Sequence, residues 1–156
     1  MVEQKDRKFG LGVLIYIFNK DFSKVLLLKR NEEKRKRNKK DWGSVGGRVD
    51  LGEKLINTCL REAKEEIGVD LNPKNIKLLK VSETPFLTDI FHTIHFVYTT
   101  VLDENEKIIL NFNGEHESDE YRWFKLTDLP DKTLDDKKEI IEFARKAKEM
   151  FKGKKF

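Results

Sequence analysis

The sequence predicts an α/β fold in which two amphipathic helices accompany several β-strands. Residues 53–67 and 134–151 carry apolar side chains at the spacing of three and four residues that is typical of a helix. Shorter segments rich in Val, Ile, Tyr and Phe, bounded by turn-forming residues, are typical of strands. Hydrophobic residues make up 38% of the chain and include 11 Phe, which is enough apolar mass for a packed core.

Length and composition indicate a single-domain protein and exclude several other classes. With 156 residues and no linker or repeat, we expect one domain over residues 1–156, with its core at about 9–151 and a frayed tail at 152–156. The 32 basic and 28 acidic residues indicate a densely charged but nearly balanced surface. A single Cys excludes an internal disulfide framework and a multi-cysteine zinc site. Because no apolar run approaches about 18 residues and residues 1–10 lack the apolar segment of a signal peptide, we expect a cytoplasmic protein that does not enter a membrane.

The first strands are followed by a strongly basic segment. Residues 9–19 and 24–30 predict two strands joined by a tight turn. Residues 31–41 contain no apolar side chain, so we expect an exposed loop or an extension of the strand. Between residues 29 and 40, eight residues are basic and two are acidic. This segment is either a solvated surface or a basic rim that attracts a polyanionic substrate.

The first predicted helix has a clear apolar ridge and a clear end. Residues 42–49, before it, contain three glycines and are expected to begin as a strand and to end as a loop. The helix carries apolar or small side chains at a spacing of four residues, namely Leu55, Cys59, Ala63 and Ile67. Cys59 is therefore expected to pack in the core. Gly68 follows, where a helix commonly ends.

Further strands and a helix are predicted towards the C-terminus. The strands are residues 76–86, 93–102, 107–113 and 121–126. The helix at residues 134–151 has an apolar side formed by Ile140, Ile141, Ala144, Ala147 and Phe151. Phe91 and Trp123 are expected in the core rather than in a platform on which a base stacks.

Three carboxylates gather on one side of the first predicted helix. Glu62, Glu65 and Glu66 are related by spacings of three and four residues, which places them on one face. Carboxylates this close repel one another, so the cluster adds no stability to a bare helix. Hard divalent cations prefer oxygen ligands, and the pattern therefore indicates a metal site. Arg61 is expected to be the counter-charge that holds Glu53 or Glu62 in place.

The segment before this helix adds candidates for binding phosphate. A glycine-rich turn lets the backbone approach a phosphate group or a metal ion closely, which makes Gly46 and Gly47 candidates. Arg48 lies beside them in the sequence, and Arg30 ends the second predicted strand. Guanidinium groups suit phosphate oxygens, so both arginines are candidate substrate contacts.

These positions together resemble the signature of the Nudix hydrolases, Gly-x5-Glu-x7-Arg-Glu-U-x-Glu-Glu-x-Gly-U, in which U is a bulky aliphatic residue. The seven positions that permit a single residue are all filled, by Gly47, Glu53, Arg61, Glu62, Glu65, Glu66 and Gly68. Ala63 is a mild departure because it occupies one U position, and Val45 stands where the family frequently has Pro. The resemblance implies an α/β/α sandwich around a mixed β-sheet.

The resemblance also implies roles for these residues. Glu65 and Glu66 would bind Mg²⁺ or Mn²⁺, and Glu62 would bind the metal or activate water. The carbonyl group of Gly46 would complete the metal shell. Glu53 with Arg61 would brace the junction between the loop and the helix.

A further acidic residue is implied near the last predicted strand. In the family, an acidic residue shortly before that strand often serves as an extra metal ligand or base. Glu115, Glu117 and Glu120 compete for this role, and the spacing from Tyr121 favours Glu117.

The reaction implied by the resemblance is hydrolysis of a nucleoside diphosphate linked to a further group X. The short chain favours a (d)NTP, cleaved to the nucleoside monophosphate and pyrophosphate. Alternatives are ADP-ribose or another nucleotide sugar, a dinucleoside polyphosphate, or the 5′ end of RNA bound through residues 34–40. A binding module without catalysis is disfavoured, because no carboxylate of the signature is missing. The sequence leaves open the group X and whether the protein is a monomer or a homodimer.

Overall fold

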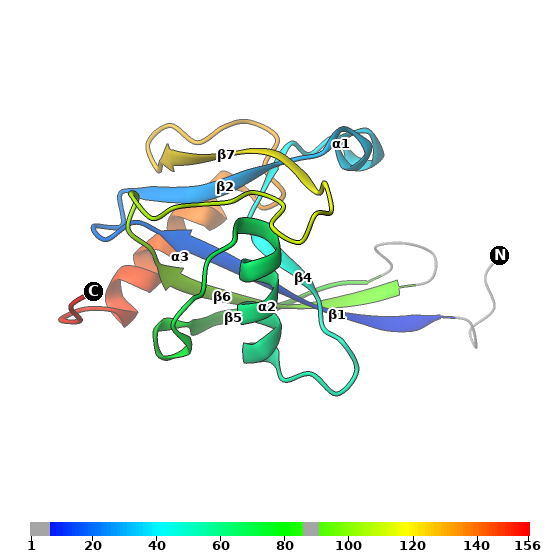
Figure 1. The fold of residues 1–156 in the computed structure, drawn as a ribbon, viewed down its shortest axis with the longest axis horizontal. Helices are drawn as coiled ribbons and strands as arrows, with labels where there is room; N and C mark the ends of the chain where they lie inside the picture. Colours follow the sequence, from blue (N-terminus) through cyan, green and yellow to red (C-terminus); the bar gives the residue numbers. More distant parts are fainter. Residues whose placement is uncertain (1–6, 86–90) are drawn as a thin grey trace.

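The computed structural model describes residues 7–85 and 91–156, and it places a seven-stranded mixed sheet between helices (Figure 1). The strands are β1 (Lys8–Phe18), β2 (Lys24–Arg30), β3 (Trp42–Gly43), β4 (Val45–Arg48), β5 (Lys77–Thr84), β6 (Phe91–Val101) and β7 (Ser118–Lys125). The helices are α1 (Glu32–Asn38), α2 (Leu55–Ile67) and α3 (Lys137–Met150), with a short 3₁₀ helix, η2 (Pro73–Asn75). Strands β1 and β6 pair in parallel, whereas the other described pairs are antiparallel. The predicted α/β fold with a mixed sheet is confirmed.

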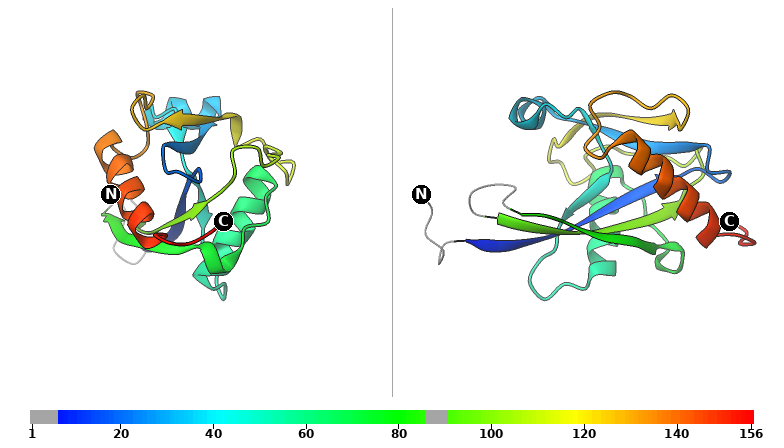
Figure 2. Two further views of the ribbon diagram at one scale, coloured as in Figure 1. Left: turned by 90° about the vertical axis from the view of Figure 1, so that its left-hand side faces the viewer. Right: turned by 180° about the vertical axis from the view of Figure 1, so that it is seen from behind.

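Helices α2 and α3 cover opposite faces of the sheet (Figure 2). Alternate side chains of β1 point to opposite faces, as the geometry of a strand requires. Val13, Ile15 and Ile17 pack in the cluster that contains the α2 residues Cys59, Ala63 and Ile67. Tyr16 and Phe18 pack in the cluster that contains the α3 residues Ile140, Phe143, Ala144 and Ala147. The predicted apolar ridge of α2 is therefore the side that anchors the helix.

The sheet forks beside β1. The middle of β1 pairs with β4, from Gly12 opposite Arg48 to Ile15 opposite Val45. At its C-terminal end β1 pairs instead with β2, at Ile17 and Phe18. Strands β2 and β4 thus share one edge of β1, and they separate from each other along it. The candidate site lies at this fork.

The basic segment is partly helical, so the predicted loop at residues 31–41 is wrong. Helix α1 occupies Glu32–Asn38 and buries no residue, which is why apolar periodicity could not indicate it. Its N-cap is Asn31, whose side chain accepts a hydrogen bond from the backbone N–H of Lys34. Acidic residues occupy its first turn and basic residues its last turn, which is the favourable order for the helix dipole.

The strand predicted at residues 107–113 is also wrong, because this segment forms turns. The backbone N–H groups of Ile109, Asn111 and Asn113 donate hydrogen bonds to carbonyl groups in the last turn of α2. The segment therefore caps a helix instead of joining the sheet. Its apolar residues pack against α2, which explains the strand-like composition.

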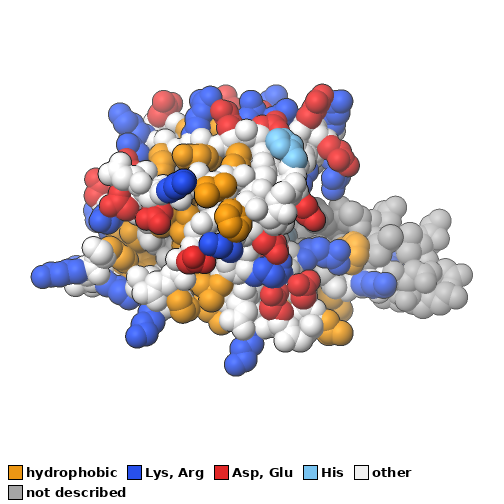
Figure 3. Space-filling model, in the orientation of Figure 1, with side chains coloured by type: hydrophobic (Ala, Val, Ile, Leu, Met, Phe, Trp, Pro, Cys, Tyr) orange, Lys and Arg blue, Asp and Glu red, His pale blue; other side chains and the backbone are white. Residues whose placement is uncertain are grey.

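The remaining boundaries differ by a few residues from those predicted. Helix α2 begins at Leu55 rather than at residue 53, and α3 begins at Lys137 after its N-cap Asp136 rather than at residue 134. The predicted strand at 76–86 ends in a residue that lies outside the described part of the chain. No helix within residues 7–85 and 91–156 is long and apolar enough to span a membrane. Basic and acidic side chains are interspersed on the face shown in Figure 3.

Candidate active site

Two glycines of strand β4 lie very close to neighbouring elements, Gly47 to helix α2 and Gly46 to strand β1. A Cβ atom at Gly47 would overlap the carboxyl group of Glu62, and one at Gly46 would overlap the carbonyl oxygen of Val13. The N–H of Gly46 donates a hydrogen bond of 2.9 Å to Oε2 of Glu66. The glycine-rich sequence predicts a close approach of phosphate or metal at these positions. In the structure, the groups that come close are the protein's own carboxylates and strand β1.

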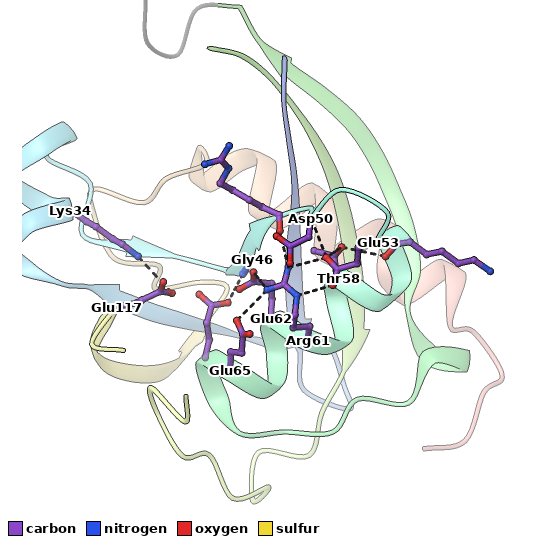
Figure 4. Close-up of polar contacts among 12 residues, drawn as sticks. Lys34, Gly46, Asp50, Glu53, Thr58, Arg61, Glu62, Glu65 and Glu117 are labelled. Carbon is purple, nitrogen blue, oxygen red and sulfur yellow. Dashed lines mark hydrogen bonds and ion pairs between the residues drawn. The ribbon is translucent and has the colours of Figure 1, made fainter. Parts of the chain in front are cut away.

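The side chain of Arg61 joins the acidic face of α2 to the preceding loop (Figure 4). Its Nε and Nη2 atoms donate to the two carboxylate oxygens of Glu53 at 2.8 and 2.9 Å. Its Nη1 atom donates to Glu62 at 2.8 Å and to Glu65 at 3.3 Å. Nη2 also donates to the carbonyl oxygen of Arg48 at 2.9 Å. One guanidinium group therefore fixes the positions of several carboxylates.

The contact between Glu53 and Arg61 shifts the pKa of both groups. Hydrogen bonds from Arg61 and from the hydroxyl of Thr58, at 2.6 Å, lower the pKa of Glu53 to about 2. The same pair raises the pKa of Arg61 above its ordinary value. Both groups are thus charged at neutral pH. These are the contacts expected of a brace at the junction of loop and helix.

Glu62 and Glu66 differ from Glu53, because their burial disfavours the charged form of the carboxyl group. Burial raises the pKa of Glu62 to about 7, although Arg61 opposes the shift. Burial also raises the pKa of Glu66 well above its ordinary value, and the hydrogen bond from Gly46 only partly opposes this. Glu62 and Glu117 add electrostatic repulsion to Glu66. The acidic face of α2 therefore has fewer basic neighbours than its carboxylates would need to be fully charged.

Glu117 is the member of the three candidates that lies beside this acidic face. It precedes β7, and its charge raises the pKa of both Glu62 and Glu66. Its Oε2 atom is 3.9 Å from Nζ of Lys34 on α1 (Figure 4). Glu120 instead pairs with Arg122 at 3.2 Å.

A cavity of about 460 Å³ opens at the fork of the sheet. Glu66 and Glu117 form its acidic wall. Its basic side chains are Arg30, Lys34, Arg37 and Arg48. The cavity therefore brings carboxylates and cations together around a space large enough for a small molecule.

Residues of β1 and β6 form the floor of the cavity. Gly10 and Gly12 of β1 line it with bare backbone, and Phe91, Thr93 and His95 of the neighbouring β6 also line the cavity. The guanidinium of Arg48 lies 5.3 Å from the centre of the Phe91 ring. Burial lowers the pKa of His95, which favours its neutral form at pH 7.

The family model for the NUDIX domain matches residues 8–144, which is most of the chain. The chain belongs to the Nudix hydrolase family. An m7GpppN-mRNA hydrolase of Saccharomyces cerevisiae is 30% identical to it over 118 residues, which cover 69% of this chain and 10% of that protein. A dihydroneopterin triphosphate diphosphatase of Escherichia coli is 28% identical over 94 residues, covering 60% of this chain and 59% of that protein. The Nudix chain thus spans less than two thirds of either relative.

Solved structures show the same Nudix fold. The crystal structure of a MutT NUDIX hydrolase from Burkholderia pseudomallei superposes with a TM-score of 0.70 at 24% identity, covering 87% of this chain and 98% of that one. The E. coli dihydroneopterin triphosphate pyrophosphohydrolase superposes with a TM-score of 0.67 at 20% identity, covering 87% and 95%. The α/β/α arrangement implied by the Nudix signature is thereby confirmed.

Nudix hydrolases generally use divalent metal ions, and this site offers carboxylate oxygens, the type of ligand that such ions prefer. Within residues 7–85 and 91–156, no three carboxylate, His or Cys side chains are gathered closely enough to hold a metal as they stand. Arg61 holds Glu62 and Glu65, and the Gly46 N–H holds Glu66, so these groups face hydrogen-bond donors instead of one another. Enclosed carboxylates with too little counter-charge are the donor set that a hard cation prefers.

The two predicted phosphate contacts both line the cavity of this Nudix site. Arg48 is exposed at its edge. Arg30 donates to Oδ1 of Asn38 at 2.6 Å and to the carbonyl of Lys40 at 2.9 Å, so it also anchors the end of α1. The sequence does not predict the floor, and Phe91, expected in the core, lines the cavity instead. The available signal was the pair Gly10 and Gly12 inside a predicted strand, since glycine in a strand often marks a close approach to the backbone.

Proposed function

We propose that this chain is a metal-dependent pyrophosphohydrolase for a nucleoside diphosphate linked to a group X, with a (d)NTP as its main substrate. The products are the nucleoside monophosphate and pyrophosphate. The cavity carries the proposal, because one space is bordered by an acidic wall, by four basic side chains and by a floor that includes Gly10, Gly12 and Phe91. These features match, in order, a cation, a chain of phosphates and a planar base.

The carboxylates are the proposed metal ligands. Glu65, Glu66 and Glu117, with the carbonyl group of Gly46, would hold Mg²⁺ or Mn²⁺, and Glu62 would activate water. A bound divalent ion neutralises phosphate oxygens and lowers the pKa of water at the site. Oxygen donors of this kind favour these two hard ions over softer metals.

The remaining roles follow from the contacts of individual side chains. Water attacks a phosphorus atom, and the bridging oxygen leaves with the bonding electron pair. Oε1 of Glu62 is held by Arg61, so Oε2 is the atom that accepts the proton from this water. A carboxylate with a pKa of about 7 is a suitable base near neutral pH. Arg48 and Arg30 would contact the phosphates, and the base would lie over Gly10 and Gly12.

A substrate panel tests this function. It contains the (d)NTPs, dihydroneopterin triphosphate, ADP-ribose, dinucleoside polyphosphates, 5′-triphosphate RNA and capped RNA, each with Mg²⁺ and with Mn²⁺. We expect a triphosphate to yield equal amounts of monophosphate and pyrophosphate. Absence of cleavage of every compound with either metal would contradict the proposal.

Hydrolysis of an RNA 5′ end is the second candidate function, and α1 is the feature that favours it. Lys34 and Arg37 of this basic helix line the cavity, and Lys36 is exposed next to them. A longer polyanion would extend from the cavity across α1. The Saccharomyces relative is named as an mRNA-cap hydrolase, although the similar region is a small part of that protein. Faster turnover of 5′-triphosphate or capped RNA than of every (d)NTP would favour this candidate.

A further inference from the structure

The segment that follows β6 is attached to the acidic end of α2. The N–H groups of Ile109, Asn111 and Asn113 donate to the carbonyl oxygens of Ile67, Glu66 and Glu65 at 2.9, 3.0 and 3.2 Å. Carbonyl groups in the last turn of a helix have no partner within the helix, so this segment supplies the missing donors. It also packs tightly there, because a Cβ atom at Gly68 would lie only 3.1 Å from Cβ of Ile109.

The side chain of Asn111 extends the attachment to Glu117. Its Oδ1 accepts hydrogen bonds from the backbone N–H groups of Glu117, at 3.0 Å, and Ser118, at 3.1 Å. Its Nδ2 donates to the carbonyl oxygen of Ser118 at 2.7 Å. One residue therefore bonds to Glu66 through its backbone and to Glu117 through its side chain. Both glutamates line the same cavity.

The backbone conformation at position 111 limits which residues can make these contacts. Its φ is 55°, in the left-handed region that Asn and Gly adopt more readily than other residues. Gly would satisfy this backbone but has no amide group. Of the two residue types, only Asn can both adopt the turn and hold the start of β7.

The contact made by Asn111 matters because Glu117 and Glu66 belong to separate elements, and their carboxylates repel each other when both are charged. Glu117 lies outside β7, in a segment without regular secondary structure. On the α1 side, the backbone N–H of Asn31 donates to its carbonyl oxygen at 3.0 Å, and Lys34 is 3.9 Å from its carboxylate. Without Asn111, repulsion would move Glu117 away from α2.

We infer that Asn111 is a positioning residue that fixes Glu117 next to Glu66 and so sets the affinity of the acidic site for a divalent cation. This inference rests on the proposed function, in which these glutamates bind metal. Residues that orient metal ligands typically change metal affinity or activity by about 10–100-fold when they are replaced.

The test is Mn²⁺ binding to the substrate-free protein, measured by electron paramagnetic resonance and by calorimetry. Asn111→Gly keeps the left-handed turn and the N–H donor to Glu66, and it removes only the amide. We expect its Mn²⁺ affinity to fall about 10–100-fold. Asn113→Ala is the matched control, since it removes a local bond from the neighbouring residue Glu115, at 3.0 Å. This control should bind Mn²⁺ like the wild type.

A double-mutant cycle shows whether Asn111 acts through Glu117. In a Glu117→Gln background, Asn111→Gly should cause no further loss of Mn²⁺ affinity, because the ligand that it positions is already gone. An equal loss in both backgrounds would overturn the inference, since it would indicate a general structural effect. Asn111→Ser is the second variant if the Gly variant does not fold. Its short hydroxyl can hold only part of the amide's bonds, so we expect a smaller loss that again disappears in the Glu117→Gln background.

The possible failures are distinguishable. Unchanged Mn²⁺ affinity in Asn111→Gly overturns this inference and leaves the proposed function standing. Absence of Mn²⁺ binding to the wild type overturns both.

Discussion

Helices α1 and α2 both border the cavity with charged side chains, but they hold those charges in different ways. Helix α1 buries no residue, and the ion pairs within the helix, such as Lys36 with Glu32 at 3.1 Å, lie in solvent. Helix α2 buries Cys59, Ala63 and Ile67 in the core and with them Glu62. A charge on α1 is therefore one of several that solvent screens, whereas a charge on α2 has fixed neighbours in an enclosed site.

This difference predicts how the two helices respond to substitution. On α2, replacing a single charged side chain should have a large effect on activity or stability, because its oppositely charged or hydrogen-bonded partner is left in an enclosed site. On α1, one change should have little effect, and several changes should act together through the electrostatic potential. The following variants test the contrast from the largest expected effect to the smallest.

Glu66→Gln should abolish most turnover. The change removes an anionic group from the acidic wall and keeps its size, so the fold should persist. A loss of several kcal/mol of transition-state stabilisation corresponds to a fall of about 10³-fold in kcat. Steady-state kinetics with Mg²⁺ and an unfolding curve provide the measurement. Glu120→Gln, outside the acidic wall, is the control, and equal activity of both variants would contradict the assigned role of α2.

Arg61→Ala should lower both activity and stability. It leaves Glu53 and Glu62 without their counter-charge, and an enclosed charge without a partner is costly. Because the Arg61 side chain is 29% exposed, we expect a loss of about 2 kcal/mol in the free energy of unfolding rather than the larger cost of a fully buried pair. Urea denaturation and Mn²⁺ binding measure the two effects. If neither changes, Arg61 is not a brace.

Glu53→Gln should reduce stability in a pH-dependent way. The pKa of Glu53 is about 2 in the folded protein and near its ordinary value of 4.5 in the unfolded chain. A carboxylate whose pKa is lowered by folding stabilises the protein above its unfolded pKa, and this contribution is lost as the pH falls through the folded pKa. The difference in unfolding free energy between wild type and variant, about 1–2 kcal/mol at pH 7, should shrink between about pH 4.5 and pH 2. A difference that stays constant down to pH 3 in urea titrations would show that the Arg61 contact is not its source.

The smallest effect is expected on α1. Lys34→Gln with Arg37→Gln removes two charges that line the cavity, and Lys36→Gln with Lys40→Gln removes two that are not among its lining residues. The first pair should lower kcat/KM a few-fold at about 0.05 M salt, leave kcat nearly unchanged, and lose its effect at about 0.5 M. The second pair should have a smaller effect at each salt concentration. Identical kinetics of both double variants and the wild type at low salt would show that the basic segment is only a solvated surface.

The sequence predicted the parts of the molecule that depend on periodicity or on a short motif. The ridge of Cys59, Ala63 and Ile67 repeats every four residues, and it is the buried side of α2. The contacts of Arg61 with Glu53 and Glu62 could also be predicted, because all three positions belong to one signature.

The sequence did not predict features that depend on caps or on distant contacts. Helix α1 has no apolar residue to repeat, and its N-cap Asn31 was not recognised as a start signal. Residues 107–113 have the composition of a strand, but their N–H groups are used by the end of α2. The cavity is lined by residues that lie far apart in the sequence, such as Gly10, Glu66 and Glu117. No local sequence pattern indicates that they lie close together.

The central claim is that the carboxylates of α2 and Glu117 form a metal-dependent site for cleaving a phosphoanhydride. The most direct measurement is product formation from a nucleoside triphosphate by metal-stripped wild-type protein, titrated with Mg²⁺. We predict no cleavage without metal, and equal amounts of nucleoside monophosphate and pyrophosphate once Mg²⁺ is restored. Cleavage that persists in excess chelator, or release of orthophosphate in place of pyrophosphate, would contradict the claim.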